Sequence, residues 1–139
     1  MRKINGIIAH CSDSDIAYHD SIKVIRHWHL ARGFSDIGYH FLVSNNGQVH
    51  KGRPIEKPGA HCKGHNRYTI GICVSGRHVF PEVQLSAFAL LTWELCLEYN
   101  LDIRAQVYPH NFFNKGKTCP NFVIKEALKD FCKLTEDYS

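Results

Sequence analysis

Three residues with the chemistry of metal ligands stand far apart in this sequence: His10, His110 and Cys119. His10 follows an apolar run, residues 4–9, that is typical of a buried strand, and open α/β sheets place their binding crevices at the carboxyl ends of strands. His110 and Cys119 are nine positions apart in a stretch without periodicity, where a loop can bring both side chains to one point. Two imidazoles and one thiolate suit zinc and leave the fourth tetrahedral position for water, as a catalytic zinc needs.

Spacing alone does not make this set specific. The chain has 10 histidines and 6 cysteines, so some triple of this kind arises by chance. Each residue also has an ordinary structural interpretation. His10 suits a hydrogen-bonded histidine at the end of a strand, and Cys119, just before Pro120, suits a buried thiol at the start of a helix. The residue types therefore leave both interpretations open.

The segments that must position these residues alternate between strand and helix patterns. Residues 4–9 predict a strand, and Asp20 or Ser21 can cap a helix that runs to about Arg32 and stops at Gly33. Asn46-Gly47 predicts a hairpin between strands over 39–43 and 48–50. The remaining expectations are a long loop over 51–66, a strand over 70–74, a helix over 82–99, a short edge strand over 103–107, irregular structure over 108–121, and a last helix over 122–134 whose Val123, Leu128 and Phe131 face inward. This order predicts an α/β fold with a central mixed β-sheet flanked by helices, as a single domain over residues 1–139.

Composition agrees with one globular domain. The chain of 139 residues is 44% hydrophobic and 22% charged, with a net charge of +4. No apolar stretch approaches the roughly 20 residues that span a bilayer, and the apolar run after Arg2 and Lys3 is too short for a signal-peptide core. We therefore expect synthesis in the cytoplasm, reduced cysteines, no membrane partner and a monomer. The basic residues form no cluster and no nucleic-acid motif, so no nucleic-acid partner is expected.

Short motifs follow one another in a fixed order along most of the chain. They are His10-Cys11-Ser12, Trp28-His29, Arg32-Gly33-Phe34, the run from Asp36 to Phe41, Asn46-Gly47, Gly52-Arg53-Pro54, residues 59–66, Ile70-Gly71-Ile72, His110, and the run from Gly116 to Pro120. This ordered set resembles the zinc-dependent N-acetylmuramoyl-L-alanine amidase family, which includes phage lysozymes of the amidase type and animal peptidoglycan recognition proteins. The resemblance implies hydrolysis of the amide bond between N-acetylmuramic acid and L-alanine in peptidoglycan.

The same resemblance implies roles for individual residues. By it, His10, His110 and Cys119 bind one Zn²⁺ ion per chain, Tyr39 and Lys117 are catalytic, and His61 and His29 border the substrate groove. Tyr39 would donate a hydrogen bond to the oxyanion that forms when the amide is attacked, and Lys117 would supply positive charge there. Outside this pattern, Tyr39 has an ordinary interpretation as sheet packing and Lys117 as a solvated loop lysine.

Three positions depart from the family pattern. Phe112 stands where many relatives have an acidic residue near the metal, which removes a carboxylate that could hydrogen-bond to a metal ligand. Val123 replaces an aspartate at the start of the last helix, so that helix has a weaker cap. Cys73 occupies the place of a glutamate that one branch of the family uses as a base. The phage-type enzymes also lack this glutamate, which favours that branch.

Two other functions stay open at this point. One is a non-catalytic module that binds peptidoglycan or muropeptides on the same fold, although such relatives usually lose the cysteine ligand and this chain keeps Cys119. The other is a basic partner of nucleic acid or of a regulatory protein, for which no motif is present. Within the amidase interpretation, a phage endolysin and a bacterial wall-degrading enzyme both fit. An endolysin made in the cytoplasm would reach the cell wall after phage-mediated release.

Overall fold

A computed structural model describes residues 1–138 of the chain. Its strands form one five-stranded mixed sheet in the order β3-β2-β4-β1-β5. The strands are β1 (Gly6–Cys11), β2 (Phe41–Val43), β3 (Val49–Lys51), β4 (Thr69–Val74) and β5 (Val107–Pro109). β1 lies between β4 and β5 and is parallel to both, β2 is parallel to β4, and only the β2–β3 hairpin is antiparallel. The predicted mixed sheet is confirmed.

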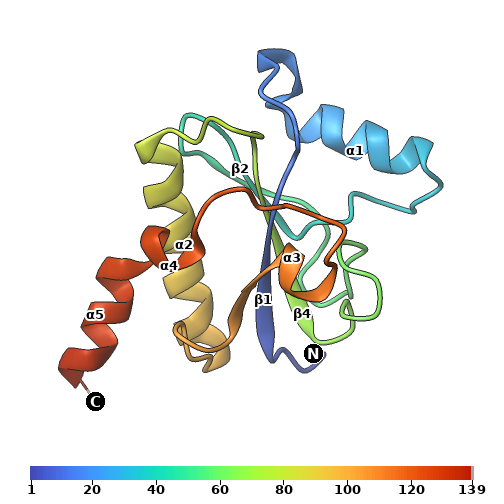
Figure 1. Cartoon of the computed structure of the whole chain (residues 1–139). Coiled ribbons are helices and arrows are strands. Elements are labelled where there is room, and N and C mark those ends of the chain that lie inside the picture. Colours follow the sequence, from blue (N-terminus) through green and yellow to red (C-terminus); the bar gives the residue numbers. More distant parts are fainter. Residues whose placement is uncertain (139) are drawn as a thin grey trace.

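Helices cover both faces of this sheet (Figure 1). They are η1 (Ala17–His19), α1 (Ile22–Ala31), α2 (Glu82–Tyr99), α3 (His110–Phe113), α4 (Ile124–Ala127) and α5 (Lys129–Tyr138). Figure 1 shows α2, α4 and α5 on one side of β1 and β4, and α1 on the other side. Among the described residues, no helix has the length and apolar character that crossing a bilayer requires. The central strands β1 and β4 are buried throughout, as strands with helices on both faces should be.

The larger hydrophobic cluster lies between the sheet and the helices α2 and α4. Alternate residues of the central strands point into it because side chains of a strand alternate between its two faces. The sheet and helix contributions include Ile7, Ala9, Ile70, Ile72, Val74, Phe88, Leu95, Ile124 and Leu128. The smaller cluster on the opposite face holds Ile25 of α1 with Ile37, Leu42 and Cys73. The bulk of the apolar burial therefore lies on the α2 side.

Local signals fix several elements as predicted. Ser21 caps α1, since its Oγ accepts a hydrogen bond from the Val24 amide at 3.4 Å. The helix ends at Ala31 with Arg32 as its C-cap, and Gly33 follows with a φ of +93°, a conformation that glycine adopts without strain. The Asn46-Gly47 turn joins β2 to β3, and α2 has the predicted bounds. Tyr39, predicted to start a strand, precedes β2, which begins at Phe41.

The predictions for the segment before His110 are partly wrong. The edge strand β5 covers Val107–Pro109 and not residues 103–107. Residues 102–106 turn instead, because the carbonyl of Asp102 accepts hydrogen bonds from the amides of Ala105 and Gln106 at 3.1 and 2.8 Å. The stretch over 108–121 is also less irregular than expected, since α3 begins at His110.

The last helix is broken into two. α4 ends at Ala127 and α5 begins at Lys129, with Leu128 between them buried in the larger cluster. Phe131 packs against the same cluster as predicted, but Val123 is 69% exposed, so its inward orientation was wrong. Val123 stands at the N-cap of α4 and makes no side-chain cap hydrogen bond, which confirms the weak cap expected from its residue type.

Candidate metal centre

Sheet pairing brings His10 and His110 together. His10 is the penultimate residue of β1, and β5 pairs with β1 so that Pro109 lies opposite Ala9. His110 follows Pro109 directly, at the first position of α3. The ring centroids of His10 and His110 are 4.4 Å apart. Parallel pairing across 100 positions of sequence therefore brings together two of the three members of the cluster.

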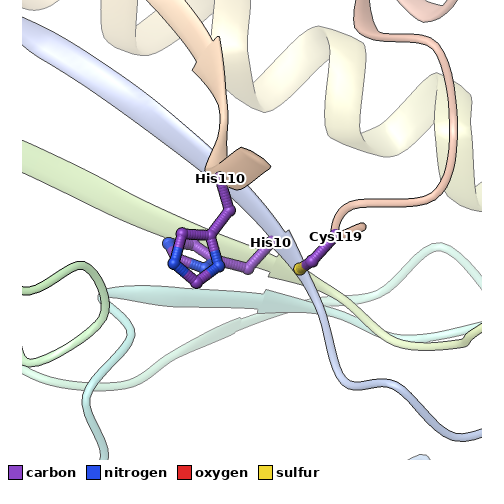
Figure 2. Close-up of side chains that lie close together, drawn as sticks. All are labelled: His10, His110 and Cys119. Carbon is purple, nitrogen blue, oxygen red and sulfur yellow. The ribbon is translucent and has the colours of Figure 1, made fainter. Parts of the chain in front are cut away.

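Cys119 completes the cluster from the loop that follows α3. The amide of Asn111 donates a hydrogen bond to the carbonyl of Cys119 at 3.0 Å, which holds the loop back against the start of α3. The ligand atoms of His10, His110 and Cys119 all lie within 4.8 Å of one another. Figure 2 shows the three side chains converging from β1, from the start of α3 and from the loop. The predicted metal-ligating residues thus form one candidate metal site.

Cys11 is the neighbour of this site that the sequence did not single out. Its backbone amide donates a hydrogen bond to Cys119 Sγ at 2.8 Å. The hydrogen bond with the Cys11 side chain, followed by burial, raises the pKa of the Cys119 thiol, so the metal-free protein keeps it protonated. Metal binding must then displace that proton, which couples metal affinity to pH.

Both histidines of the cluster are held in the neutral form that binds a metal. Burial lowers the pKa of His10 well below its ordinary value of 6.5, and His61 and His110 lower it further. Burial also lowers the pKa of His110, with the positive charge of Lys117 as the second cause. Neutral imidazoles with free lone pairs at neutral pH are the state that zinc requires of its ligands.

The cluster opens into a cleft of about 610 Å³ that Tyr39 and Lys117 also line. The Tyr39 ring lies with its centroid 5.2 Å from that of His10. Burial, and then the neighbouring cysteines, raise the pKa of the Tyr39 phenol well above 10, so it stays protonated and able to donate a hydrogen bond. Lys117 is exposed at the rim. The structure therefore brings both predicted catalytic residues beside the candidate metal site.

His29 forms part of the cleft wall as a neutral side chain with a fixed tautomer. Its Nδ1 accepts a hydrogen bond from the Gly38 amide at 2.7 Å, which leaves the single proton on Nε2. Burial lowers the pKa of His29 to about 4, helped by Arg32 and Arg53. Its ring centroid lies 5.2 Å from that of Tyr39. His29 therefore presents a neutral imidazole beside Tyr39.

His61 lies deeper in the same cleft, with only 8% of its surface exposed. Its Nδ1 is 2.8 Å from Nε2 of His10. Asn66 fixes the backbone there, because its Oδ1 accepts hydrogen bonds from the amides of His61 and Cys62 at 3.0 and 2.9 Å. Sequence reasoning had no signal for the contact between His61 and His10, because 51 positions separate them.

The departures from the family pattern lie around the site without entering the cluster. Phe112 is 55% exposed and packs against the rings of Tyr108 and Phe113. Cys73 pairs with His10 across β1 and β4 and is fully buried, and this burial raises the pKa of its thiol well above 9. Neither side chain offers a carboxylate.

The fold and site together define an α/β protein with a candidate metal site of two histidines and one cysteine at the carboxyl end of a central parallel strand. Residues 1–122 match the N-acetylmuramoyl-L-alanine amidase family, and the chain belongs to this family. It is 39% identical to the endolysin of Enterobacteria phage T3, over 95% of this chain and 90% of the relative. It is 32% identical to the endolysin of Klebsiella phage KP32, over 99% and 93% of the two chains.

A solved structure shows the same fold. The N-acetylmuramoyl-L-alanine amidase LysC from Clostridium intestinale URNW superimposes with a TM-score of 0.82 at 26% identity, over 94% of this chain and 86% of that one. The predicted family, fold class and enzyme class are confirmed, and the activity is that of an amidase acting on peptidoglycan. The family match ends at residue 122, so the extent of one domain over 1–139 stays a prediction.

Proposed function

We propose that this chain is a zinc-dependent endolysin that cleaves the amide bond between N-acetylmuramic acid and L-alanine in peptidoglycan. The observation that carries the proposal is the convergence of His10, His110 and Cys119 within 4.8 Å at the base of an open cleft. The phage endolysins among the relatives support this role over that of a bacterial wall-remodelling enzyme. We further propose cytoplasmic synthesis, action on the wall after phage-mediated release, and a monomeric enzyme.

The donor set fits one zinc ion per chain. Two neutral imidazoles and one thiol that can lose its proton match a catalytic zinc site with three protein ligands. The hydrogen bond from the Cys11 amide to Cys119 Sγ stabilises the thiolate form of this ligand. When bound, zinc would act as a Lewis acid that polarises the amide carbonyl, and it would lower the pKa of a bound water.

Tyr39 and Lys117 stabilise the negative charge that develops on the carbonyl oxygen of the substrate. Tyr39 stays protonated because of its raised pKa, so its hydroxyl donates a hydrogen bond to the developing oxyanion. Lys117 adds positive charge at the rim of the cleft, which it lines together with His110 and Cys119. The leaving amine must receive a proton, and the phenol of Tyr39 is one group that can donate it.

The walls of the cleft suit a stem peptide. Arg32, Lys63 and Lys117 line it with positive charge, against the single carboxylate of Asp13. Peptidoglycan or muropeptide stems carry carboxylates, so this balance favours their approach. His29 offers an Nε2–H donor to the bound peptide, and His61 forms part of the floor. We assign these three cations to the binding of peptidoglycan in the cleft. We propose neither a nucleic-acid nor a membrane partner.

The test uses purified protein and isolated peptidoglycan, with the products followed by mass spectrometry. Stem peptides with a free L-alanine amino terminus should appear, vanish on chelation and return with stoichiometric zinc. Cys119→Ser should abolish both release and stoichiometric zinc binding. Cys62→Ser, the same change in the same cleft outside the cluster, should retain both.

The competing function is a non-catalytic binding module. Protein that holds stoichiometric zinc and sediments with peptidoglycan, yet releases no peptide from intact wall or soluble muropeptides, would establish that alternative. Release that persists in Cys119→Ser without zinc would instead contradict the assigned metal site.

A further inference from the structure

A line of hydrogen bonds leads from His10 through His61 and Thr69 to the backbone of His65. Nε2 of His10 lies 2.8 Å from Nδ1 of His61. Nε2 of His61 lies 3.4 Å from Oγ1 of Thr69, and this hydroxyl donates to the carbonyl oxygen of His65 at 2.6 Å. The line therefore ends at a backbone group whose role is fixed.

That fixed end sets the direction of every hydrogen bond before it. A carbonyl oxygen only accepts hydrogen bonds, so the Thr69 hydroxyl donates its one proton to the His65 carbonyl. It can therefore only accept a hydrogen bond from His61. His61 is only 8% exposed and its ring nitrogens face a histidine and a hydroxyl, so the buried ring is neutral and carries one proton. That proton lies on Nε2, facing Thr69, so Nδ1 of His61 accepts. His10 must then donate from Nε2.

The protein is built around the His61 ring in this orientation. A Cβ atom at Gly71 would meet Cγ of His61 at 2.5 Å, and one at Gly59 would meet its Cδ2 at 2.6 Å. Only glycine leaves room for the ring on both sides. The amides of His61 and Cys62 donate hydrogen bonds to Asn66 Oδ1, and together with this close packing they hold the ring in place.

We propose that His61 and Thr69 are positioning residues that hold the proton of His10 on Nε2 and leave its Nδ1 lone pair for the metal. The inference rests on the proposed function, because it deepens the role of the same metal site. It also changes the role of His61. Both of its ring nitrogens are engaged inside the protein, so it acts on His10 and does not bind substrate through them. Partners of this kind orient a metal-binding histidine and fix its tautomer.

The tautomer is read directly in the metal-free full chain. Long-range ¹H–¹⁵N correlation spectra distinguish an Nε2–H imidazole from an Nδ1–H imidazole. Wild type should show His10 as the Nε2–H form alone. Thr69→Val removes the hydroxyl, so nothing holds the proton of His61 on Nε2, and a mixture of the two His10 tautomers should appear. Thr69→Ser keeps the hydroxyl and should show the Nε2–H form of His10 alone.

Zinc affinity, measured by competition with a chromophoric chelator, gives a second readout. His61→Leu removes the acceptor and should weaken zinc binding about 10–100-fold. His61→Asn is smaller but places an amide oxygen near the position of Nδ1, so it should recover much of that loss. Thr69→Val should weaken binding about tenfold or less, and Thr69→Ser should match wild type.

Two results would overturn the inference: His10 in the Nδ1–H form in wild type, or equal zinc affinities for His61→Leu and wild type. If His61→Leu does not fold, the Thr69→Val and Thr69→Ser pair decides by tautomer and affinity. Failure of the proposed function looks different. Wild type that binds no zinc refutes the metal site, while the tautomer of metal-free His10 still confirms or refutes the line of hydrogen bonds.

Discussion

The two faces of the sheet differ in what they bury. The face under α2 and α4 holds a large apolar cluster that includes the fully buried ring of Phe88. The face under α1 holds a small apolar cluster next to a cleft that contains neutral histidines, Tyr39 and Cys119. Hydrophobic burial stabilises roughly in proportion to apolar area, so the first face supplies most of the stability. The face under α1 can then bury polar groups that the proposed catalysis requires, although their burial costs free energy of folding.

The same strands serve both faces because side chains alternate along them. On β4, Ile70, Ile72 and Val74 enter the large cluster, whereas Gly71 lies against His61 and Cys73 joins the small cluster. A shift of one residue in register would exchange these sets and destroy both the core and the site. The difference between the faces can be tested by changes confined to one of them.

The largest expected effect is on the apolar face. Phe88→Ala should lower the free energy of unfolding by about 3–5 kcal/mol, since it removes a large buried ring and leaves a cavity. Urea unfolding measures this loss. Zinc affinity and the turnover per folded molecule should stay at the wild-type level. A fall in zinc affinity of the folded variant would show that the two faces are not independent.

Tyr39→Phe makes the complementary change on the cleft face. Removal of one hydrogen-bond donor to the oxyanion should lower kcat about 10²–10³-fold. KM and the thermal midpoint should hardly change, because the ring remains. Steady-state kinetics on soluble muropeptides separates these effects. Tyr18→Phe, at a tyrosine that is 78% exposed, serves as the control and should retain wild-type kcat.

Acidification should weaken the cleft face before the apolar face. Burial lowers the pKa of both His29 and His40 to about 4, against an ordinary value of 6.5. Between pH 6.5 and pH 4 these histidines bind protons in the unfolded chain and stay neutral in the folded chain. The free energy of unfolding therefore falls as the pH falls. The loss should be on the order of 3 kcal/mol for each of these histidines, because one pKa unit corresponds to about 1.4 kcal/mol.

Unfolding of metal-free protein by urea at a series of pH values measures this slope. His29→Gln should flatten it between pH 6.5 and pH 4. His27→Gln, at an exposed position of the same helix, should leave it unchanged. A wild-type stability that is constant over this window would contradict the buried neutral histidines.

The smallest effect concerns the helix that covers the cleft face. Ser21→Ala removes the side chain that accepts from the Val24 amide and should cost about 1 kcal/mol. Ser35→Ala, at an exposed position after the helix, should cost almost nothing. Thermal unfolding of the two variants gives the comparison. Equal midpoints would mean that the cap contributes no stability to α1.

The sequence by itself determined the features that rest on local chemistry. The Ser21 cap, the Asn46-Gly47 turn and the bounds of α2 follow from side-chain and backbone preferences within a few residues. The candidate metal ligands were also visible, because the ordered motifs carry the resemblance to the family. The predictions failed where tertiary contacts decide, as in the break at Leu128, whose side chain is buried in the large cluster.

Only the tertiary structure decided how the ligands are held. The parallel pairing of β1 with β5 places His110 beside His10, and the loop after α3 places Cys119 Sγ against the Cys11 amide. The same packing sets His61 between His10 and Thr69 in a space that Gly71 leaves open. These contacts join residues that local preference does not relate, and their hydrogen bonds gain strength from burial that only the assembled sheet provides.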